Sequence, residues 1–147
     1  MDSNFLLRQL PKTVLDHYKA QGTTDIDHIR FKNYPNDKIA VILVRPAVGA
    51  AMDIWECDRV FHNAIKNLPK QIFRTYRQRK ALSKIQEADF FMTGATQNIR
   101  LNLGDRTETW QWVLAGCGDY NVWQCVTSIF CSDSVYEFPK PKWTRLC

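Results

Sequence analysis

Residues 109–131 read TWQWVLAGCGDYNVWQCVTSIFC, and their pattern predicts two strands joined by a tight turn. Trp110, Trp112 and Leu114 alternate with other residues, so they share one face of the first strand. A Gly-Cys-Gly-Asp segment with turn composition follows, and residues 121–131 are rich in β-branched and aromatic side chains. Because strands joined by a short turn pair antiparallel, the C-terminal third of the chain is expected to form a β-meander.

Shorter segments extend this meander and predict further strands near the N-terminus. Ile99–Leu103 alternates ahead of the two long strands, and Ser134–Phe138 is expected to add a short edge strand. Residues 26–32 alternate apolar and polar side chains, and Lys38–Val44 is a β-branched run. The Asn-Tyr-Pro-Asn-Asp segment between them favours a turn, so these two segments predict a β-hairpin.

Apolar residues at helical spacing predict helices before the hairpin and between the hairpin and the meander. Helices and antiparallel strands in separate runs are typical of the α+β class. We therefore expect N-terminal helices and a β-hairpin, a central helix pair, and a C-terminal antiparallel β-meander. The sheet should hold about five or six strands within a single domain over residues 1–147. The expected helices are Asn4–Leu10, Lys12–Ala20, Gly49–Ile65 and a basic helix from Pro69 to about Ala88.

The positive charge of the chain is concentrated in residues 64–86, which read AIKNLPKQIFRTYRQRKALSKIQ. This segment holds seven Lys and Arg residues and no Asp or Glu. The whole chain has 20 Lys and Arg against 15 Asp and Glu, so the 13 basic residues outside the segment are outnumbered by the acidic ones. A localised positive charge steers a protein toward a polyanion, most often nucleic acid or an anionic membrane surface.

The basic residues of this segment fall on one side of the helix that the sequence predicts. On a helical wheel, six of the seven cations lie within an arc of about 120°, and only Arg79 lies outside it. A solvated helix face is the alternative interpretation, but such faces usually mix the two charges in i,i+4 pairs. Phe73 lies in the same arc, where it can stack on a base or a sugar. The predicted nucleic-acid-binding residues are Lys66, Lys70, Phe73, Arg74, Arg77, Lys80 and Lys84.

A second candidate site lies on the first strand of the predicted hairpin, where His28, Arg30 and Lys32 alternate and so share one face. A histidine with two fixed cations is suited to metal-free RNA cleavage, because the imidazole transfers a proton while the cations stabilise charge on the phosphate. These three residues are the predicted catalytic group. The alternative interpretation is the exposed polar face of a half-buried hairpin, which requires only this alternation.

The sequence carries no motif for a cofactor or a metal ion, and we expect neither. The glycines do not form a phosphate-binding loop, and the spacings of Cys117, Cys125 and Cys131 differ from those of closed zinc sites. The five cysteines form no Cys-x-x-Cys pair, and the N-terminus shows neither a signal-peptide pattern nor a membrane-spanning run. We therefore expect free thiols in a reducing, cytoplasmic environment.

Three functions fit these observations. The leading hypothesis is a small basic nucleic-acid-binding protein, with RNA favoured over DNA and metal-free cleavage as an extension. The first alternative is a non-enzymatic interaction or assembly protein, of viral or mobile-element type, that binds an acidic protein partner. The second alternative is an enzyme or binding protein that holds a small anionic ligand in a Trp-lined pocket. A deep pocket on the Trp-rich sheet would favour this last hypothesis, and a flat sheet beside a basic face would favour the first.

Overall fold

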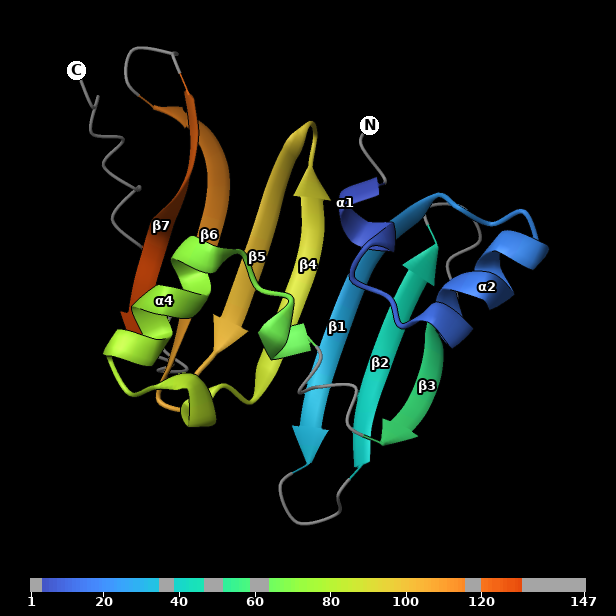
Figure 1. The fold of residues 1–147 in the computed structure, drawn as a ribbon, viewed down its shortest axis with the longest axis horizontal. Helices are drawn as coiled ribbons and strands as arrows, with labels where there is room; N and C mark the ends of the chain where they lie inside the picture. The colour runs from blue at the N-terminus through green and yellow to red at the C-terminus, as the bar shows by residue number, and fades with distance from the viewer. Residues whose placement is uncertain (1–3, 35–38, 47–51, 59–63, 116–119, 131–147) are drawn as a thin grey trace.

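The computed structural model describes residues 4–34, 39–46, 52–58, 64–115 and 120–130. In these ranges the chain forms an antiparallel sheet with short helices on one of its faces (Figure 1). No helix among them combines the length and the apolar character that crossing a membrane requires. The helical elements are α1 (Asn4–Leu7), α2 (Lys12–Ala20), α4 (Lys70–Gln78) and the 3-10 turn η1 (Leu82–Lys84). The strands are β1 (Ile26–Tyr34), β2 (Ile39–Pro46), β3 (Asp53–Asp58), β4 (Glu87–Thr93), β5 (Thr96–Asn102), β6 (Arg106–Ala115) and β7 (Tyr120–Phe130).

The strands are ordered β3-β2-β1-β4-β5-β6-β7, and every neighbouring pair is antiparallel. β1, β2 and β3 form a first meander, and β4 to β7 form a second one. The chain leaves β3 at one edge of the sheet, passes through the segment that contains α4, and pairs β4 with β1 in the middle of the sheet. The second meander confirms the α+β class and the antiparallel arrangement predicted for the C-terminal part.

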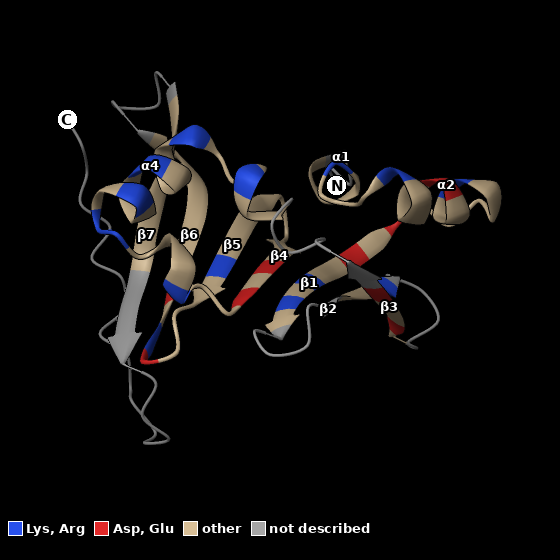
Figure 2. Cartoon of the chain, turned by 60° about the horizontal axis from the view of Figure 1, so that its bottom comes forward, with Lys and Arg blue, Asp and Glu red and all other residues tan. Residues whose placement is uncertain are grey.

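The hydrophobic core lies between the sheet and the helices, which all cover the same face (Figure 2). The strand register aligns the apolar side chains of this face across the sheet, with Ile29 of β1 between Val44 of β2 and Phe90 of β4. Helices α2 and α4 each add a fully buried tyrosine to the core, Tyr18 and Tyr76. The opposite face of the sheet therefore carries the alternate, mostly polar residues of the same strands.

Several predicted elements are confirmed. Helix α2 has the predicted bounds and begins directly after Pro11, which occupies its N-cap position. β1 and β2 form the predicted hairpin, and β5, β6 and β7 cover the predicted strands of the meander. Trp112 and Trp123 lie opposite each other on β6 and β7, as expected if the turn between these strands is short. That turn and the edge strand expected at Ser134–Phe138 lie outside the described residues.

The helix predicted over Gly49–Ile65 is wrong, because Asp53–Asp58 forms the edge strand β3. Pairing with β2 gives the backbone groups of both segments hydrogen-bond partners. Two side-chain bonds also join β3 to α2, since the Tyr18 hydroxyl donates to Asp53 (2.8 Å) and accepts from the indole nitrogen of Trp55 (3.0 Å). The helix was predicted from the spacing of apolar residues within this segment, and that spacing carries no information about such long-range contacts.

The basic helix is shorter than predicted, because α4 ends at Gln78 and β4 occupies Glu87–Thr93. Lys80 has a left-handed φ of 54°, and the Ala81 N–H donates to the Tyr76 carbonyl at 2.8 Å. This hydrogen bond is typical of a Schellman ending, in which glycine usually occupies the left-handed position. Because lysine and not glycine occupies this position, the sequence gives no sign that the helix ends here. β3 and β4 together enlarge the sheet from the five or six strands expected to seven in the described residues.

Candidate functional site

Helix α4 is held on the sheet by buried side chains and by hydrogen bonds to β6 and β7. Ile72 and Tyr76 are 0% exposed and face the sheet. The indole nitrogen of Trp110 donates to the Tyr76 hydroxyl at 2.8 Å. The side-chain amide of Gln71 donates to the carbonyl of Trp123 (2.6 Å) and accepts from its N–H (3.1 Å). These contacts fix the orientation of the helix, so that its opposite side faces solvent.

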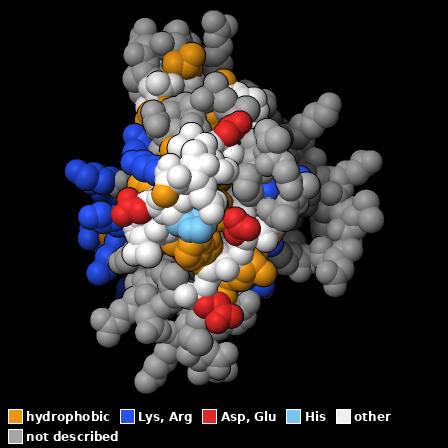
Figure 3. Space-filling view, turned by 90° about the vertical axis from the view of Figure 1, so that its right-hand side faces the viewer, with side chains coloured by type: hydrophobic (Ala, Val, Ile, Leu, Met, Phe, Trp, Pro, Cys, Tyr) orange, Lys and Arg blue, Asp and Glu red, His pale blue; other side chains and the backbone are white. Residues whose placement is uncertain are grey.

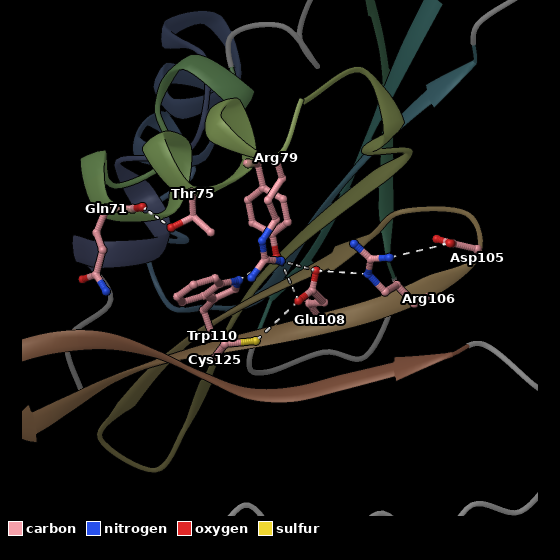
Figure 4. A network of polar contacts seen from close by, with 9 residues as sticks. Gln71, Thr75, Arg79, Asp105, Arg106, Glu108, Trp110 and Cys125 are labelled. Carbon is pink, nitrogen blue, oxygen red and sulfur yellow. Dashed lines mark hydrogen bonds and ion pairs between the residues drawn. The ribbon is translucent and has the colours of Figure 1, made fainter. Parts of the chain in front are cut away.

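Arg79, the cation that the helical wheel places outside the basic arc, points toward the sheet (Figure 4). Its Nη1 lies 3.1 and 3.2 Å from the two carboxylate oxygens of Glu108, a residue that is 1% exposed. Arg106 Nε (3.3 Å) and the Cys125 thiol (3.7 Å) also contact this carboxylate. Glu108 was not among the residues predicted from the sequence. Its position two residues before Trp110, on the apolar side of the strand, is the signal that indicates a buried ion pair.

The other six cations of residues 64–86 are exposed, and none forms an ion pair with a carboxylate in the described part of the chain. Figure 2 shows Lys and Arg on α4 and on the turns around it, with no acidic residue among them. Phe73 is half-buried, and the guanidinium carbon of Arg77 lies 5.9 Å from its ring centre. The predicted single arc is wrong, because three of the cations lie before or after α4. The six residues, called the basic segment below, are Lys66, Lys70, Arg74, Arg77, Lys80 and Lys84.

The surface formed by α2 and β3 has a different character (Figure 3). A histidine, apolar side chains and acidic side chains share its centre, and the largest group of Lys and Arg in this view lies along its left border. In this region His17 packs edge-on against Trp55 with ring centroids 4.9 Å apart, and Asp53 and Glu56 are exposed. The surface over α2 and β3 therefore mixes apolar, acidic and imidazole side chains, unlike the basic segment.

The predicted catalytic group shares one face of β1, on the side of the sheet opposite the helices. Each of its three residues lies close to a carboxylate on β4. Arg30 Nε is 2.9 Å from Asp89 Oδ1, and Lys32 Nζ is 3.6 Å from Glu87 Oε1. His28 Nε2 is 3.8 Å from Asp89 Oδ2, which is too long for a hydrogen bond but within the range of an ion pair with a protonated imidazole. The cations of this group are therefore neutralised inside the protein.

Asp89 is the centre of this ion network and is 4% exposed. Burial alone would raise its pKa, but the interactions with His28 and Arg30 outweigh burial and hold the pKa of the carboxyl below its usual value. The hydrogen bond to Asp89 in turn raises the pKa of Arg30. Both groups are therefore charged at neutral pH, and a phosphate would have to compete with Asp89 for the guanidinium.

Phe91 on β4 also packs on the histidine of this group. The rings of His28 and Phe91 stack with centroids 5.6 Å apart and an interplanar angle of 10°, and Arg100 lies over the same phenyl ring at 4.7 Å. His28 Nε2 is buried and has no hydrogen-bond partner among the described residues. This nitrogen is therefore closed to a substrate, and Arg30 and Lys32 are already paired with carboxylates, so the geometry favours a structural role for the group.

The low pKa of Asp89 predicts a specific dependence of stability on pH. A carboxyl whose pKa is lower in the folded state stabilises the protein above its unfolded pKa of about 3.9. This contribution is lost as the pH falls through the folded pKa. Asp89→Asn should therefore lower the free energy of unfolding by about 2 kcal/mol at neutral pH, and the difference from wild type should shrink in acid. Urea unfolding across a pH series measures it.

The exposed Asp105, whose side chain is 63% accessible, provides the control for this experiment. Asp105→Asn should change stability by less than about 0.5 kcal/mol at any pH. A difference between Asp89→Asn and wild type that stays constant down to strongly acidic pH would contradict the assignment of a low pKa to Asp89.

A pocket of about 650 Å³ opens between α1, the start of α4 and the Trp-rich end of the sheet. Trp112, Trp123 and Phe5 supply its aromatic wall. Trp123 is buried, whereas Trp112 is half-buried. The Trp-rich sheet is therefore not flat at this end, and the pocket lies beside the basic segment, because Asn67 and Pro69 also line it.

No family model, curated protein or solved structure matches this chain. Within the described ranges, no three His, Cys, Asp or Glu side chains gather in a way that could hold a metal ion. The function is therefore inferred from three features: the basic segment, the aromatic pocket beside it, and the ion network on the opposite face.

Proposed function

We propose that this protein binds nucleic acid through the basic segment, with RNA favoured over DNA. One observation carries the proposal. The six cations of the basic segment are exposed and have no carboxylate partner in the described residues, whereas Arg79 of the same stretch is neutralised by Glu108. Like charges gathered in one place repel each other, and a polyanion relieves this repulsion while its condensed counterions are released.

The way in which α4 is attached supports this proposal. Because Ile72 and Tyr76 fix one side of the helix to the core, Lys70 and Arg74 project from a rigid backbone, which lowers the entropic cost of binding. RNA is favoured because its unpaired bases are commonly accessible, and an aromatic pocket lies beside the same helix.

Cleavage is not part of the proposal. The His28 group lies on the opposite face of the sheet from α4, and its cations are paired with Asp89 and Glu87. A phosphate bound by the basic segment would therefore be separated from His28 by the sheet itself. An acidic protein partner would use the same six cations, and the experiment below distinguishes it from RNA.

Replacing Lys70 and Arg74 together with glutamate is expected to weaken binding to a short single-stranded RNA by about tenfold or more, because two phosphate contacts are lost and two repulsive charges are added. The slope of log affinity against log salt concentration should fall by about 1.4, the value for two phosphates of a single strand. Fluorescence anisotropy of a labelled RNA over a salt series measures both quantities.

The matched control replaces Lys12 and Lys19 of α2 with glutamate, since both are exposed and the change in net charge is the same. This variant should bind RNA with nearly the wild-type affinity. Equal losses in the two variants would show that net charge, and not the basic segment, governs binding. If the wild-type protein binds polyglutamate but not RNA, the result would instead support an acidic protein partner.

A further inference from the structure

The pocket beside the basic segment has walls suited to a flat aromatic ligand. Trp112 of β6 and Trp123 of β7 pack with ring centroids 5.4 Å apart and planes tilted by 47°, and Phe5 of α1 lies 6.1 Å from Trp123. Because Trp112 is half-buried, part of its indole ring remains exposed in the pocket wall. An exposed indole ring is a stacking surface for any nucleobase.

Three side-chain amides, those of Gln9, Asn67 and Gln97, line the same pocket. The Gln9 amide nitrogen donates to the Phe5 carbonyl at 3.1 Å, and its Oε1 is buried, with no hydrogen-bond donor among the described residues. In the described part of the chain, the side chains of Asn67 and Gln97 form no hydrogen bond. The amides of Asn67 and Gln97 can therefore each offer both an acceptor and N–H donors. The described lining residues include no carboxylate.

Cations lie beside this pocket. Arg8, which follows α1, lines it, is exposed, and forms no ion pair with a described carboxylate. Asn67 and Pro69 line it from the segment just before α4, and Lys66 and Lys70 are their neighbours in the chain. A ring bound in the pocket would therefore have cations close to any phosphate attached to it.

We propose that this pocket takes one unpaired base of a single-stranded nucleic acid whose phosphates lie along the basic segment. The inference rests on the proposed function and adds to it a preference for single strands. The base ring stacks on Trp112, and its edge exchanges hydrogen bonds with the amides of Asn67 and Gln97.

Other ligands fit this pocket less well. An inorganic anion would use the cations but would make no use of the exposed Trp112 ring or of the amides of Asn67 and Gln97. A base inside a duplex cannot enter, because its edge is paired and both of its faces are stacked. The volume of about 650 Å³ lies in the range of pockets that hold small molecules, which is sufficient for a nucleotide.

Two short single-stranded probes test this proposal: an ordinary oligonucleotide, and an abasic one with the same number of phosphates. Wild-type protein should prefer the ordinary strand over the abasic one, and also over a duplex of the same sequence. Trp112→Leu should lower affinity for the ordinary strand by about tenfold or more and leave affinity for the abasic strand unchanged. Its salt slope should stay at the wild-type value, because no phosphate contact is lost. Anisotropy measures all of these affinities.

A second pocket variant and a control variant distinguish the loss of a pocket contact from a change in folding. Gln97→Leu removes one amide without touching the aromatic wall, and it should weaken binding of the ordinary strand about fivefold. Trp55 is also half-buried but lies on β3, outside the described pocket lining. Trp55→Leu should therefore bind both strands as the wild type does.

The possible results separate the pocket from the basic segment. Equal binding of the two strands by wild-type protein, or equal losses on both strands in Trp112→Leu, would overturn the pocket proposal and leave binding by the basic segment intact. Failure of wild-type protein to bind either strand would overturn both. A loss confined to the ordinary strand, in both pocket variants, is the result expected.

Discussion

Replacing Trp110 with alanine is expected to lower the free energy of unfolding by about 3–5 kcal/mol. Trp110 is 6% exposed and lies beneath α4, where its ring packs edge-on against Tyr76 at 6.1 Å and 72°. Its indole nitrogen donates to the Tyr76 hydroxyl at 2.8 Å. Burial raises the pKa of Tyr76, so this hydroxyl stays protonated. The truncation therefore creates a large cavity and also leaves a buried hydroxyl without its donor.

Denaturant unfolding followed by circular dichroism measures this loss, and Trp112→Ala is the matched control. Trp112 lies two residues further along β6 but is half-buried in the pocket wall, so its truncation should cost only about 1–2 kcal/mol. Equal losses at the two positions would contradict the division between a core tryptophan and a pocket tryptophan. Since small domains are stable by only about 5–15 kcal/mol, Trp110→Ala should also lower the melting temperature markedly.

Replacing Glu108 with glutamine is expected to lower the free energy of unfolding by about 2–3 kcal/mol. Glutamine keeps the size of the side chain but removes the charge that Arg79 and Arg106 share. Its amide also replaces one of the two oxygen acceptors that Arg79 contacts with an N–H donor. The two arginine side chains are 46% and 29% exposed, so water partly replaces the lost carboxylate. The loss therefore stays below that of a fully buried ion pair.

Glu56→Gln is the control for this variant, because Glu56 is an exposed acidic residue on β3. It should change stability by less than about 0.5 kcal/mol. Glu108→Gln should also increase hydrogen exchange at the C-terminal end of α4, where Arg79 follows the last helical residue. Unfolding of both variants at the same denaturant concentration would show that the Arg79–Glu108 contact does not hold α4 on the sheet.

Elements with strong local signals were predicted correctly from the sequence. Pro11 and the apolar spacing after it define α2, and the alternation of residues 26–32 defines β1. The β-branched and aromatic residues of 109–131 predict the paired strands β6 and β7. In each case the residues that decide the element lie within it or next to it, so neighbours in the chain carry enough information.

The sequence also determined part of the candidate site. A segment with seven cations and no carboxylate has no local partner for its charges, and six of these cations have no carboxylate partner among the described residues. The wheel position of Arg79 distinguished it from the others, and it is this residue that pairs with Glu108. The shared face of His28, Arg30 and Lys32 follows directly from strand geometry.

Tertiary structure alone decided the partners of these residues. Arg30 and Asp89 are separated by 59 positions in the sequence, and Arg79 and Glu108 by 29. A local sequence pattern therefore cannot predict either ion pair. The apolar residues of this segment have helical spacing, but Asp53–Asp58 forms strand β3. It does so because its backbone pairs with β2 and its side chains form hydrogen bonds with Tyr18. The pocket likewise exists only because α1, α4 and three strands meet at one end of the sheet. Backbone and charged groups that leave water need a partner, and the fold, not the neighbouring sequence, determines which partner lies within reach.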